Sequence, residues 1–569
     1  MSLFTGVNSR QRDDPSIQSY ASEIFNGSVI EDSTVKAREV SYRPVNLSSS
    51  EGPFDFHIPP EGDLYINPNR MRLSGRFKVQ KMDANGRLSN LDDSDMVSLV
   101  NMAPYSFFRM FDIDFQGKLV TYGATPNHHY KAYLENLLSY SKGAKDTHLK
   151  CALFEMDDPE AYGQASTKNK GWVRRRKWIE YSKECDFNID LHNDVLGIDK
   201  FLPNDLDISI RLHRAPDSFS LMAANRATVN WDTALSGDDP NATQSDPTQD
   251  KNDPRYVPPN KRVKRSPQAG GNDIDNAQTL ANKTKIEEIG TDISQLKQEL
   301  SALKAKHNAD IRNVSDASLT NGENLGVIPD YRIIFTDLVL HVDKVEMSPE
   351  FVKATNEDFA KGRRAIYPFC RSIIKTKQIP KGAHVAQFDN VFTNVLPTNI
   401  MAVMVKSSAY GGSIQENPFL FNHYNVNHIN FKVNGEITPP GGLDCVFKGK
   451  VKPGEAPDDA TKVAKNSQDQ EKSLYRNMYR RLFDHTGINT ENTTNGITPE
   501  LFLNGCTIFP HDYSPDRCLG QHEHKPTTGK FDVQFNFDEP LPEGITILVL
   551  GSYDEELVMD GSRNVVYDE

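Results

Sequence analysis

Arg70-Met-Arg-Leu-Ser-Gly-Arg-Phe-Lys-Val79 alternates between charged and apolar side chains along most of its length. Because successive side chains of a β-strand point to opposite faces, this pattern predicts a strand with one buried and one solvated face. The same period of two recurs in Phe111–Phe115, Phe187–Leu191, Leu206–Leu212, Leu338–Val342, Ile429–Val433 and Phe531–Phe537. Many alternating runs separated by turn residues predict antiparallel β-sandwiches, so we expect an all-β fold.

Two segments have helical spacing instead. In His129–Ser141 the tyrosines and leucines recur every three or four residues, and Gly143 follows as a stop signal. Ser473–Asp484 shows the same spacing, with Gly487 beyond it. We therefore expect one short helix in each half of the chain.

The order of these segments suggests an internal duplication. Each half contains an isoleucine-proline turn (Ile58-Pro59, Ile379-Pro380), and then a strand that ends in a glycine turn (Gln116-Gly117, Asn434-Gly435). A helix follows, and then a long strand, a proline connection (Pro203; Pro540 and Pro542) and another strand. Repetition of this order predicts two similar sandwiches in tandem. The alternative is that any two β-domains look alike at this level of detail.

These patterns divide the chain into an N-terminal arm (1–50), a first sandwich (51–347) and a second sandwich (348–569). An insert (223–328) interrupts the first sandwich, and its first part is rich in Asp, Pro, Asn, Gln and Ser. Such a composition buries too little apolar surface to offset the entropy of ordering.

The insert then acquires a heptad pattern, which predicts a coiled-coil helix over 283–307. The seam consists of Ile286, Ile289, Ile293, Leu296, Leu300 and Leu303. Fewer than three clean heptads make a marginal helix in isolation, so we expect the partners to come from neighbouring chains. The alternative is an amphipathic helix that lies on its own domain.

Composition excludes several classes of protein. The 569 residues contain 65 Lys and Arg against 78 Asp and Glu, a net charge of −13, which argues against a protein that coats nucleic acid. No run approaches the roughly 18 apolar residues that span a bilayer, and the first residues do not resemble a secretory signal. The six cysteines are then expected to be free thiols of an intracellular product: Cys151, Cys185, Cys370, Cys445, Cys506 and Cys518.

No sequence signature of catalysis is present, neither a P-loop, a dinucleotide fingerprint, a nucleophile elbow nor a zincin motif. We therefore expect a protein that is not an enzyme and has no cofactor. One weak candidate for a metal site combines thiols and imidazoles, which zinc prefers: Cys506, His511, Cys518, His522 and His524. Its spacing matches no standard finger, and a solvated loop with incidental histidines is the favoured interpretation.

Two basic stretches stand out against the acidic average. The first is a predicted loop between Trp172 and Trp178, with Arg174, Arg175, Arg176 and Lys177. It suits stacking on bases or phosphate binding, but in so acidic a chain we favour arginines that pair with carboxylates at a subunit contact. The second has Lys261, Arg262, Lys264 and Arg265 and reads as a nuclear-import signal, a dibasic cleavage site or a merely solvated charge run.

Several segments resemble the major capsid proteins of Polintons (Mavericks) and adintoviruses. The helix His129–Tyr140 resembles a tyrosine- and leucine-rich segment of that family, followed by a basic stretch and Lys150–Phe154. Further similar segments are Asn204–Leu212, Asp217–Met222, Asn417–Asn425 and Asn495–Ile497. The resemblance spans roughly 50–222 and 331–560 and is specific in the order of its segments.

This resemblance implies a double jelly-roll capsid protein. Three copies would form a pseudo-hexagonal trimer that tiles an icosahedral shell around double-stranded DNA. The partners would be the chain itself, neighbouring trimers, penton and minor capsid proteins and, indirectly, the DNA. The protein would reside in the virion after assembly inside the host cell, with the nucleus as a candidate compartment.

The resemblance also suggests a place for the insert, between the last two strands of the first sandwich. We hypothesise that Ile286–Leu303 from three subunits meet on the threefold axis as a tower or clasp. The alternative function is a two-sandwich minor capsid protein or a receptor- or glycan-binding surface protein.

Overall fold

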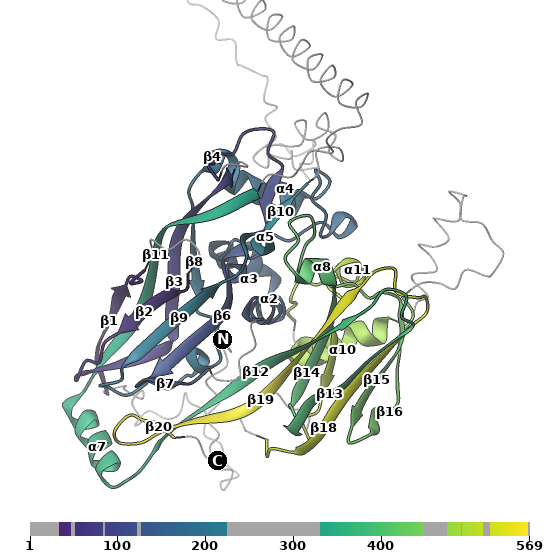
Figure 1. Ribbon diagram of the computed structural model, residues 1–569. Coiled ribbons are helices and arrows are strands. Elements are labelled where there is room, and N and C mark those ends of the chain that lie inside the picture. The colour runs from purple at the N-terminus through teal and green to yellow at the C-terminus, as the bar shows by residue number, and fades with distance from the viewer. Residues whose placement is uncertain are drawn as a thin grey trace, which may run out of the picture. The chain divides into compact units, whose positions relative to one another are not determined.

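Antiparallel strands dominate the computed structural model, which describes residues 33–46, 52–82, 86–121, 127–224, 330–447, 475–490, 492–515 and 524–566. These strands form two sandwiches of two sheets each (Figure 1). The all-β prediction is therefore confirmed.

The first sandwich pairs a five-stranded sheet with a four-stranded sheet. In the larger sheet the order is β1-β11-β3, and β4 and β8 both pair with β3; in the smaller it is β2-β9-β6-β7. The bounds are β1 Thr34–Tyr42, β2 Phe54–Ile58, β3 Leu64–Met82, β4 Leu88–Asn90, β6 Phe108–Phe115, β7 Lys118–Leu119, β8 Cys185–Asp190, β9 Ile208–Arg214 and β11 Asp330–Met347. A separate short pair joins β5 Val97–Leu99 to β10 Leu221–Ala223.

The second sandwich has the same two kinds of sheet. One has the order β12-β19-β14-β17, with β20 also paired to β19, and the other has the order β13-β18-β15-β16. The bounds are β12 Ala365–Ile379, β13 Val385–Val395, β14 Asn399–Lys406, β15 Val426–Val433, β16 Glu436–Asp444, β17 Phe509–Asp512, β18 Thr528–Phe537, β19 Ile545–Met559 and β20 Val565–Val566.

Both sandwiches share one strand order. Without the short strands β4, β5, β10 and β20, each has eight strands, and the sheets read first-eighth-third-sixth and second-seventh-fourth-fifth in both cases. Two four-stranded sheets with these crossing connections form a jelly roll. The fold is thus a double jelly roll, and the predicted duplication is present.

The glycine turns are the most accurate sign of this duplication. Gln116-Gly117 and Asn434-Gly435 each join the fourth strand to the fifth as a two-residue hairpin turn. All four residues have positive φ, between 52° and 87°, which is the type I′ geometry that suits the twist of a hairpin.

The proline features of the proposed repeat are not equivalent, and this part of the prediction was wrong. Ile58-Pro59 follows the second strand of its sandwich, whereas Ile379-Pro380 follows the first. Likewise, Pro203 precedes the seventh strand, but Pro540 precedes the eighth. Proline suits the end of any strand because it cannot donate to the ladder, so it does not identify which strand ends.

The first sandwich begins earlier than the predicted boundary at residue 51. Strand β1 lies within the segment assigned to the arm (1–50) and pairs antiparallel with β11, for example Val40 with Val342. Most of its side chains are exposed, including Val35 at 59%. Because β1 is an edge strand with little burial, its sequence carries almost no alternation.

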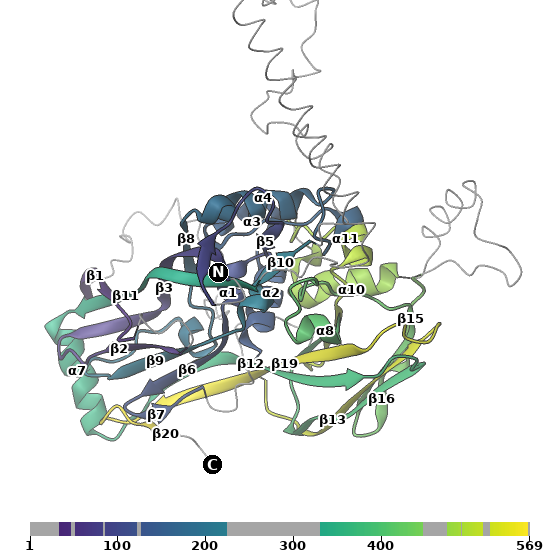
Figure 2. The same cartoon turned by 45° about the horizontal axis from the view of Figure 1, so that its top comes forward.

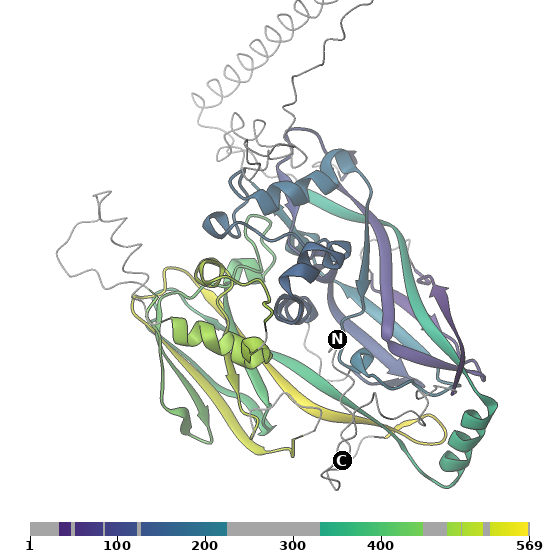
Figure 3. The same cartoon turned by 180° about the vertical axis from the view of Figure 1, so that it is seen from behind.

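The two predicted helices are confirmed as α2 (His128–Ser139) and α10 (Arg476–Thr486), each between the fifth and sixth strands of its sandwich. Each half holds more helices than the single one expected. Figure 2 shows α1, α3 and α4 gathered beside β5 and β10, and Figure 3 shows α7 at the opposite end of the first sandwich. The additional helices are α1 Ala103–Ser106, α3 Lys142–Asp146, α4 Lys170–Ile179, α5 Asp217–Ser220, α7 Pro349–Ala360, α8 Ser407–Tyr410 and α11 Pro499–Asn504.

Along the chain, the insert falls between the seventh and eighth strands of the first sandwich, since β9 ends at Arg214 and β11 begins at Asp330. Its heptad seam (Ile286–Leu303) and its basic stretch (Lys261–Arg265) lie outside the described residues. Within the described ranges, no helix is long and apolar enough to cross a membrane.

Candidate assembly interface

Helix α2 packs between the two sandwiches. Ten of its twelve residues are buried. The ring of Tyr133 stacks on Phe419 of the second sandwich, with centroids 4.0 Å apart and planes 7° apart. Tyr130 stacks on Tyr410 of α8 at 5.8 Å. We call this contact between α2 and the second sandwich the α2 junction; it joins the two jelly rolls into one compact unit.

Polar contacts extend the α2 junction at its C-terminal end. The ammonium of buried Lys145 donates to the main-chain oxygens of Leu137, in α2, and Asn495, in the second sandwich. Burial lowers the pKa of Lys145 to about 8. The Lys142 N–H donates to the Thr494 oxygen at 3.0 Å. The second sandwich is therefore also bound through hydrogen bonds to its main-chain oxygens. Any side chain at Asn495 or Thr494 would leave these acceptors in place.

Buried charges lie beside the same helix. The Lys131 ammonium contacts the Asp194 carboxylate and lies 3.7 Å from Oε2 of Glu135, which also bonds to His192. The N–H of Ser372, in β12, donates to Asp194 at 3.1 Å. Burial alone would raise the pKa of Glu135, but Lys131 and His192 outweigh it and hold the pKa below its usual value. These charges are mutually paired, as burial requires.

A close contact near α11 requires a glycine. Gly505 has φ of 153°, and a Cβ there would lie 2.1 Å from Cδ1 of Tyr162. The Tyr162 hydroxyl also accepts from the Cys506 thiol at 3.4 Å and bonds to the Tyr133 hydroxyl at 3.1 Å. The first and second sandwiches thus meet at a point without room for another side chain.

We expect Gly505→Ala to destabilise the protein by about 2–3 kcal/mol, because the added methyl must displace the packed ring of Tyr162. Urea denaturation measures this change. Gly197→Ala is the matched control, since a Cβ there meets nothing within 4 Å and should change stability by less than about 1 kcal/mol. Equal effects of the two substitutions would show that the contact at Gly505 is not tight.

The basic stretch from Trp172 to Trp178 forms helix α4, so the predicted loop was wrong. Asn169 caps the helix by accepting from the Trp172 N–H, and the Trp172 indole donates to the Met222 oxygen at 3.1 Å. Trp172 is fully buried. The stretch is helical because one of its faces, led by Trp172 and Ile179, packs into the first sandwich.

The cations of α4 pair with carboxylates of their own chain. Arg175 is fully buried; its guanidinium bonds to Asp157 at 2.6 Å and to the Leu99 oxygen at 2.8 Å. Arg174 bonds to Glu155 at 2.6 Å. The favoured interpretation was that these arginines pair with carboxylates at a subunit contact. The pairs of Arg174 and Arg175 do involve carboxylates, but both lie within one chain. Arg176 is partly buried, and Lys177 is exposed.

The three described residues of the weak metal cluster do not form a metal site. Cys506 is buried against Tyr162, the His511 ring stacks on Phe431 at 5.0 Å, and His524 bonds to Asp554. Cys518 and His522 lie outside the described residues. In the part of the chain that the structure describes, no three His, Cys, Asp or Glu side chains come together as metal ligands would.

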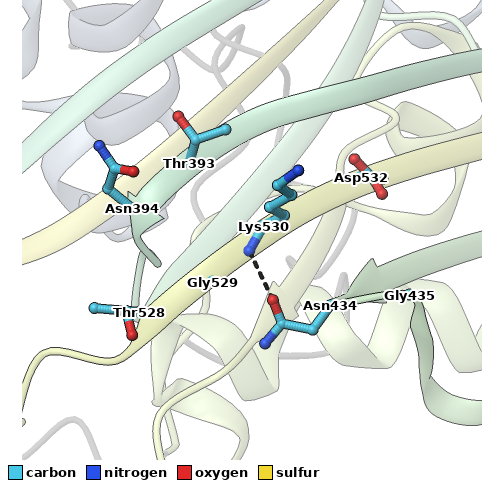
Figure 4. A pocket seen from close by; sticks show the side chains of 8 residues that line it. All are labelled: Thr393, Asn394, Asn434, Gly435, Thr528, Gly529, Lys530 and Asp532. Carbon is cyan, nitrogen blue, oxygen red and sulfur yellow. Dashed lines mark hydrogen bonds between the residues drawn. The ribbon is translucent and has the colours of Figure 1, made fainter.

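A cavity of about 580 Å³ lies where β13, β18 and the β15–β16 turn end (Figure 4). Asn434 closes one wall, and its side-chain oxygen accepts from the Lys530 N–H at 2.9 Å. The lining is mostly main chain and small polar groups: Thr393, Asn394, Asn434, Gly435, Thr528, Gly529, Lys530 and Asp532. It offers no nucleophile paired with a base and so gives no support to a catalytic role.

Comparison with known proteins adds information on the fold. No family model matches the chain. An uncharacterized protein of Caenorhabditis elegans, F54H12.2, is 20% identical over 531 residues, which cover 92% of this chain and 95% of the relative.

Several viral structures are similar to this chain. A chain in the 3.5 Å cryo-EM structure of the Sputnik virophage is 10% identical, with a TM-score of 0.51 over 97% of this chain and 92% of that one. The mavirus major capsid protein is also 10% identical, with a TM-score of 0.42 over 99% and 97% of the two chains. For the Faustovirus major capsid protein the identity is 8% and the TM-score 0.44, over 94% and 92%.

Proposed function

We propose that this protein is a viral major capsid protein whose trimers tile an icosahedral shell around double-stranded DNA. The observation that carries the proposal is the repetition of one strand order in two sandwiches of a single chain, joined by α2. Three such chains present six similar sandwiches, which is the arrangement that a pseudo-hexagonal building block needs. The fold is shared with a chain of the Sputnik virophage structure, which supports a role in a virus.

We further propose that this protein is a capsid protein of the Polinton and adintovirus type. Three segments that resemble this family come together at the α2 junction: His129–Tyr140 holds Tyr133, Asn417–Asn425 holds Phe419, and Asn495–Ile497 accepts from Lys145. A set of segments far apart in sequence but in contact in the fold is a stronger sign than any one of them. The relative from Caenorhabditis elegans supports the proposal that this type of protein also occurs as copies carried by host genomes.

The role is structural and requires no enzyme activity or cofactor. With a net charge of −13, the shell would enclose DNA without coating it, and other proteins would neutralise the genome. The proposed partners are further copies of the chain and penton and minor capsid proteins. The proposed location is the virion, after assembly in the host cell.

The insert has a proposed role in the trimer. The seam residues from Ile286 to Leu303 would meet those of two further subunits on the threefold axis, and Lys261–Arg265 would act as a cleavage or import signal. Removal of residues 283–307 should then lower the stability of the trimer but leave each chain folded, as judged by trimer dissociation on dilution. A deletion variant that dissociates like the full chain would contradict this role.

Stoichiometry tests the shell function. In purified particles, this chain should be the most abundant protein, as a tiling subunit must be. A minor capsid or receptor-binding protein, the alternative function, would instead be present at a few copies per vertex. Quantitative mass spectrometry of particle proteins separates the two, and low abundance in intact particles would overturn the proposal.

A further inference from the structure

Two adjacent histidines, His128 and His129, lie at the start of α2. Their surroundings disfavour the protonated form of the imidazole ring. His128 stacks on Phe111 of β6, with centroids 4.0 Å apart, and His129 packs edge-on against Phe219 of α5 at 4.2 Å. Both side chains are buried. Nε2 of His128 and Nδ1 of His129 have no hydrogen-bond partner in the described structure. Each ring is thus held as a neutral aromatic group.

The charges around the two rings also oppose protonation. On α2 itself, Lys131 lies near His128, and His192 from the segment before β9 faces it too. Arg109 of β6 is the charged group that acts on His129. A positive charge on either ring would therefore add to an environment that already contains cations.

The nearby carboxylates are already engaged. Glu135 of α2 is held by Lys131 and His192, and Asp194 is held by Lys131 and by the Ser372 N–H of β12. Burial raises the pKa of Asp194 above its usual value, in spite of Lys131. Because the folded chain binds a proton at Asp194 more readily than the unfolded chain does, this carboxyl does not contribute to a loss of stability on acidification, which is left to the two histidines.

A small cavity lies beside this cluster. It has a volume of about 40 Å³, and its lining includes His128, Lys131, Asp194 and Ser372. That volume holds one water molecule. The cavity borders both sandwiches, since Ser372 belongs to the second and the other three residues to the first.

We propose that the N-terminal end of α2 is docked on the first sandwich through a proton-sensitive joint. This joint weakens as pH falls, because release from Phe111 and Phe219 lets His128 and His129 bind protons. This inference goes beyond the proposed function and does not depend on it, because it concerns the isolated chain. In a capsid, such a joint would let an acidic compartment loosen the subunit without any ligand.

The direction follows from linkage. Burial lowers the pKa of His129 to about 3 and that of His128 well below its usual value, whereas both have a pKa of about 6.5 in the unfolded chain. Below pH 6.5 the unfolded chain binds protons that the folded chain refuses, so stability falls as pH falls. Each histidine lowers the folding equilibrium constant up to tenfold per pH unit, and the two together up to a hundredfold.

The test compares urea unfolding of the full chain between pH 7.0 and pH 5.0. The double variant His128→Asn, His129→Asn should lose most of the pH dependence of the wild type, even if it is less stable at pH 7. His57→Asn is the matched control, because His57 is an exposed histidine of β2 and should leave the slope unchanged. An unaltered slope in the double variant would overturn the proposal.

Hydrogen exchange of the wild-type chain provides a readout that needs no variant. After correction for intrinsic rates, the amides of α2 should exchange at least tenfold faster at pH 5.0 than at pH 7.0, whereas those of β18 and β19 should change less. Equal changes in α2 and in the strands would mean general acid unfolding and would contradict a joint at α2. Both measurements stand whether or not particles form.

Discussion

Arg175→Met should lower the free energy of unfolding by about 3–5 kcal/mol, the usual cost of removing one partner from a buried ion pair. The guanidinium is fully buried and bonds to Asp157, whose side chain is only 2% exposed. Without it, the carboxylate of Asp157 would keep only the Gly163 N–H, at 3.2 Å, among its described hydrogen-bond donors. The main-chain oxygens of Leu99 and Glu155 would also lose this donor. Chemical denaturation monitored by tryptophan fluorescence measures the loss, because Trp172 lies in the same helix.

Arg174→Met is the matched control for this prediction. Arg174 is the preceding residue of α4, its side chain is 56% exposed, and its partner Glu155 keeps Lys150. We expect a cost below about 1 kcal/mol. Adding Asp157→Asn to Arg175→Met should recover part of the lost stability, because no unpaired buried charge then remains. Similar costs for the two arginine substitutions would show that the buried pair is not a main support of α4.

Tyr133→Ala should destabilise the α2 junction by about 3–5 kcal/mol, as truncation of a buried aromatic ring does. Its ring is buried and stacked on Phe419, and its hydroxyl bonds to Tyr162. Since this stack joins the two sandwiches, the loss should appear as separate unfolding transitions of the two halves. Calorimetry of the full chain measures this, with one transition expected for the wild type and two for the variant.

Tyr181→Ala controls for the removal of a tyrosine ring. Tyr181 is 50% exposed and lies outside the junction, so its truncation should cost less than about 1 kcal/mol and leave a single transition. A double-mutant cycle of Tyr133 with Phe419 should give a coupling of about 0.5–1.5 kcal/mol. A coupling near zero would mean that the stack does not hold the sandwiches together.

The interior of the fold could be predicted because a strand with one buried face alternates apolar and polar residues in its sequence. Alternating runs such as Phe531–Phe537 have one face in the core. Both hairpin turns end in Gly, and Asn434-Gly435 is the pair that type I′ geometry favours. The helices α2 and α10 have apolar residues at helical spacing for the same reason. In each of these elements, burial and local backbone preference agree.

Edge strands and buried charges could not be predicted in the same way. Strand β1 is largely exposed, so its pairing with β11 depends on main-chain hydrogen bonds that any sequence can form. In α4, four consecutive cations suggested a loop at a subunit contact, because their carboxylate partners Glu155 and Asp157 come from another segment of the same chain. Which arginine is buried depends on the tertiary fold and not on the composition of the stretch.

The α2 junction shows the same limit. The sequence of α2 predicted a helix, and Lys131 and Glu135 have the spacing of a pair within a helix. It did not predict that Phe419 would stack on Tyr133 of that helix. Nor did it predict that Asn495 would accept from Lys145 of α3, just beyond it. The family resemblance selected these segments by their order along the chain, but it did not predict that they are in contact.

Electron microscopy of the purified full chain at high concentration tests the central claim most directly, since a capsid subunit must associate with copies of itself. We predict pseudo-hexagonal trimers with six sandwiches each, or closed shells built from them. Particles that remain single chains at every concentration would contradict the account.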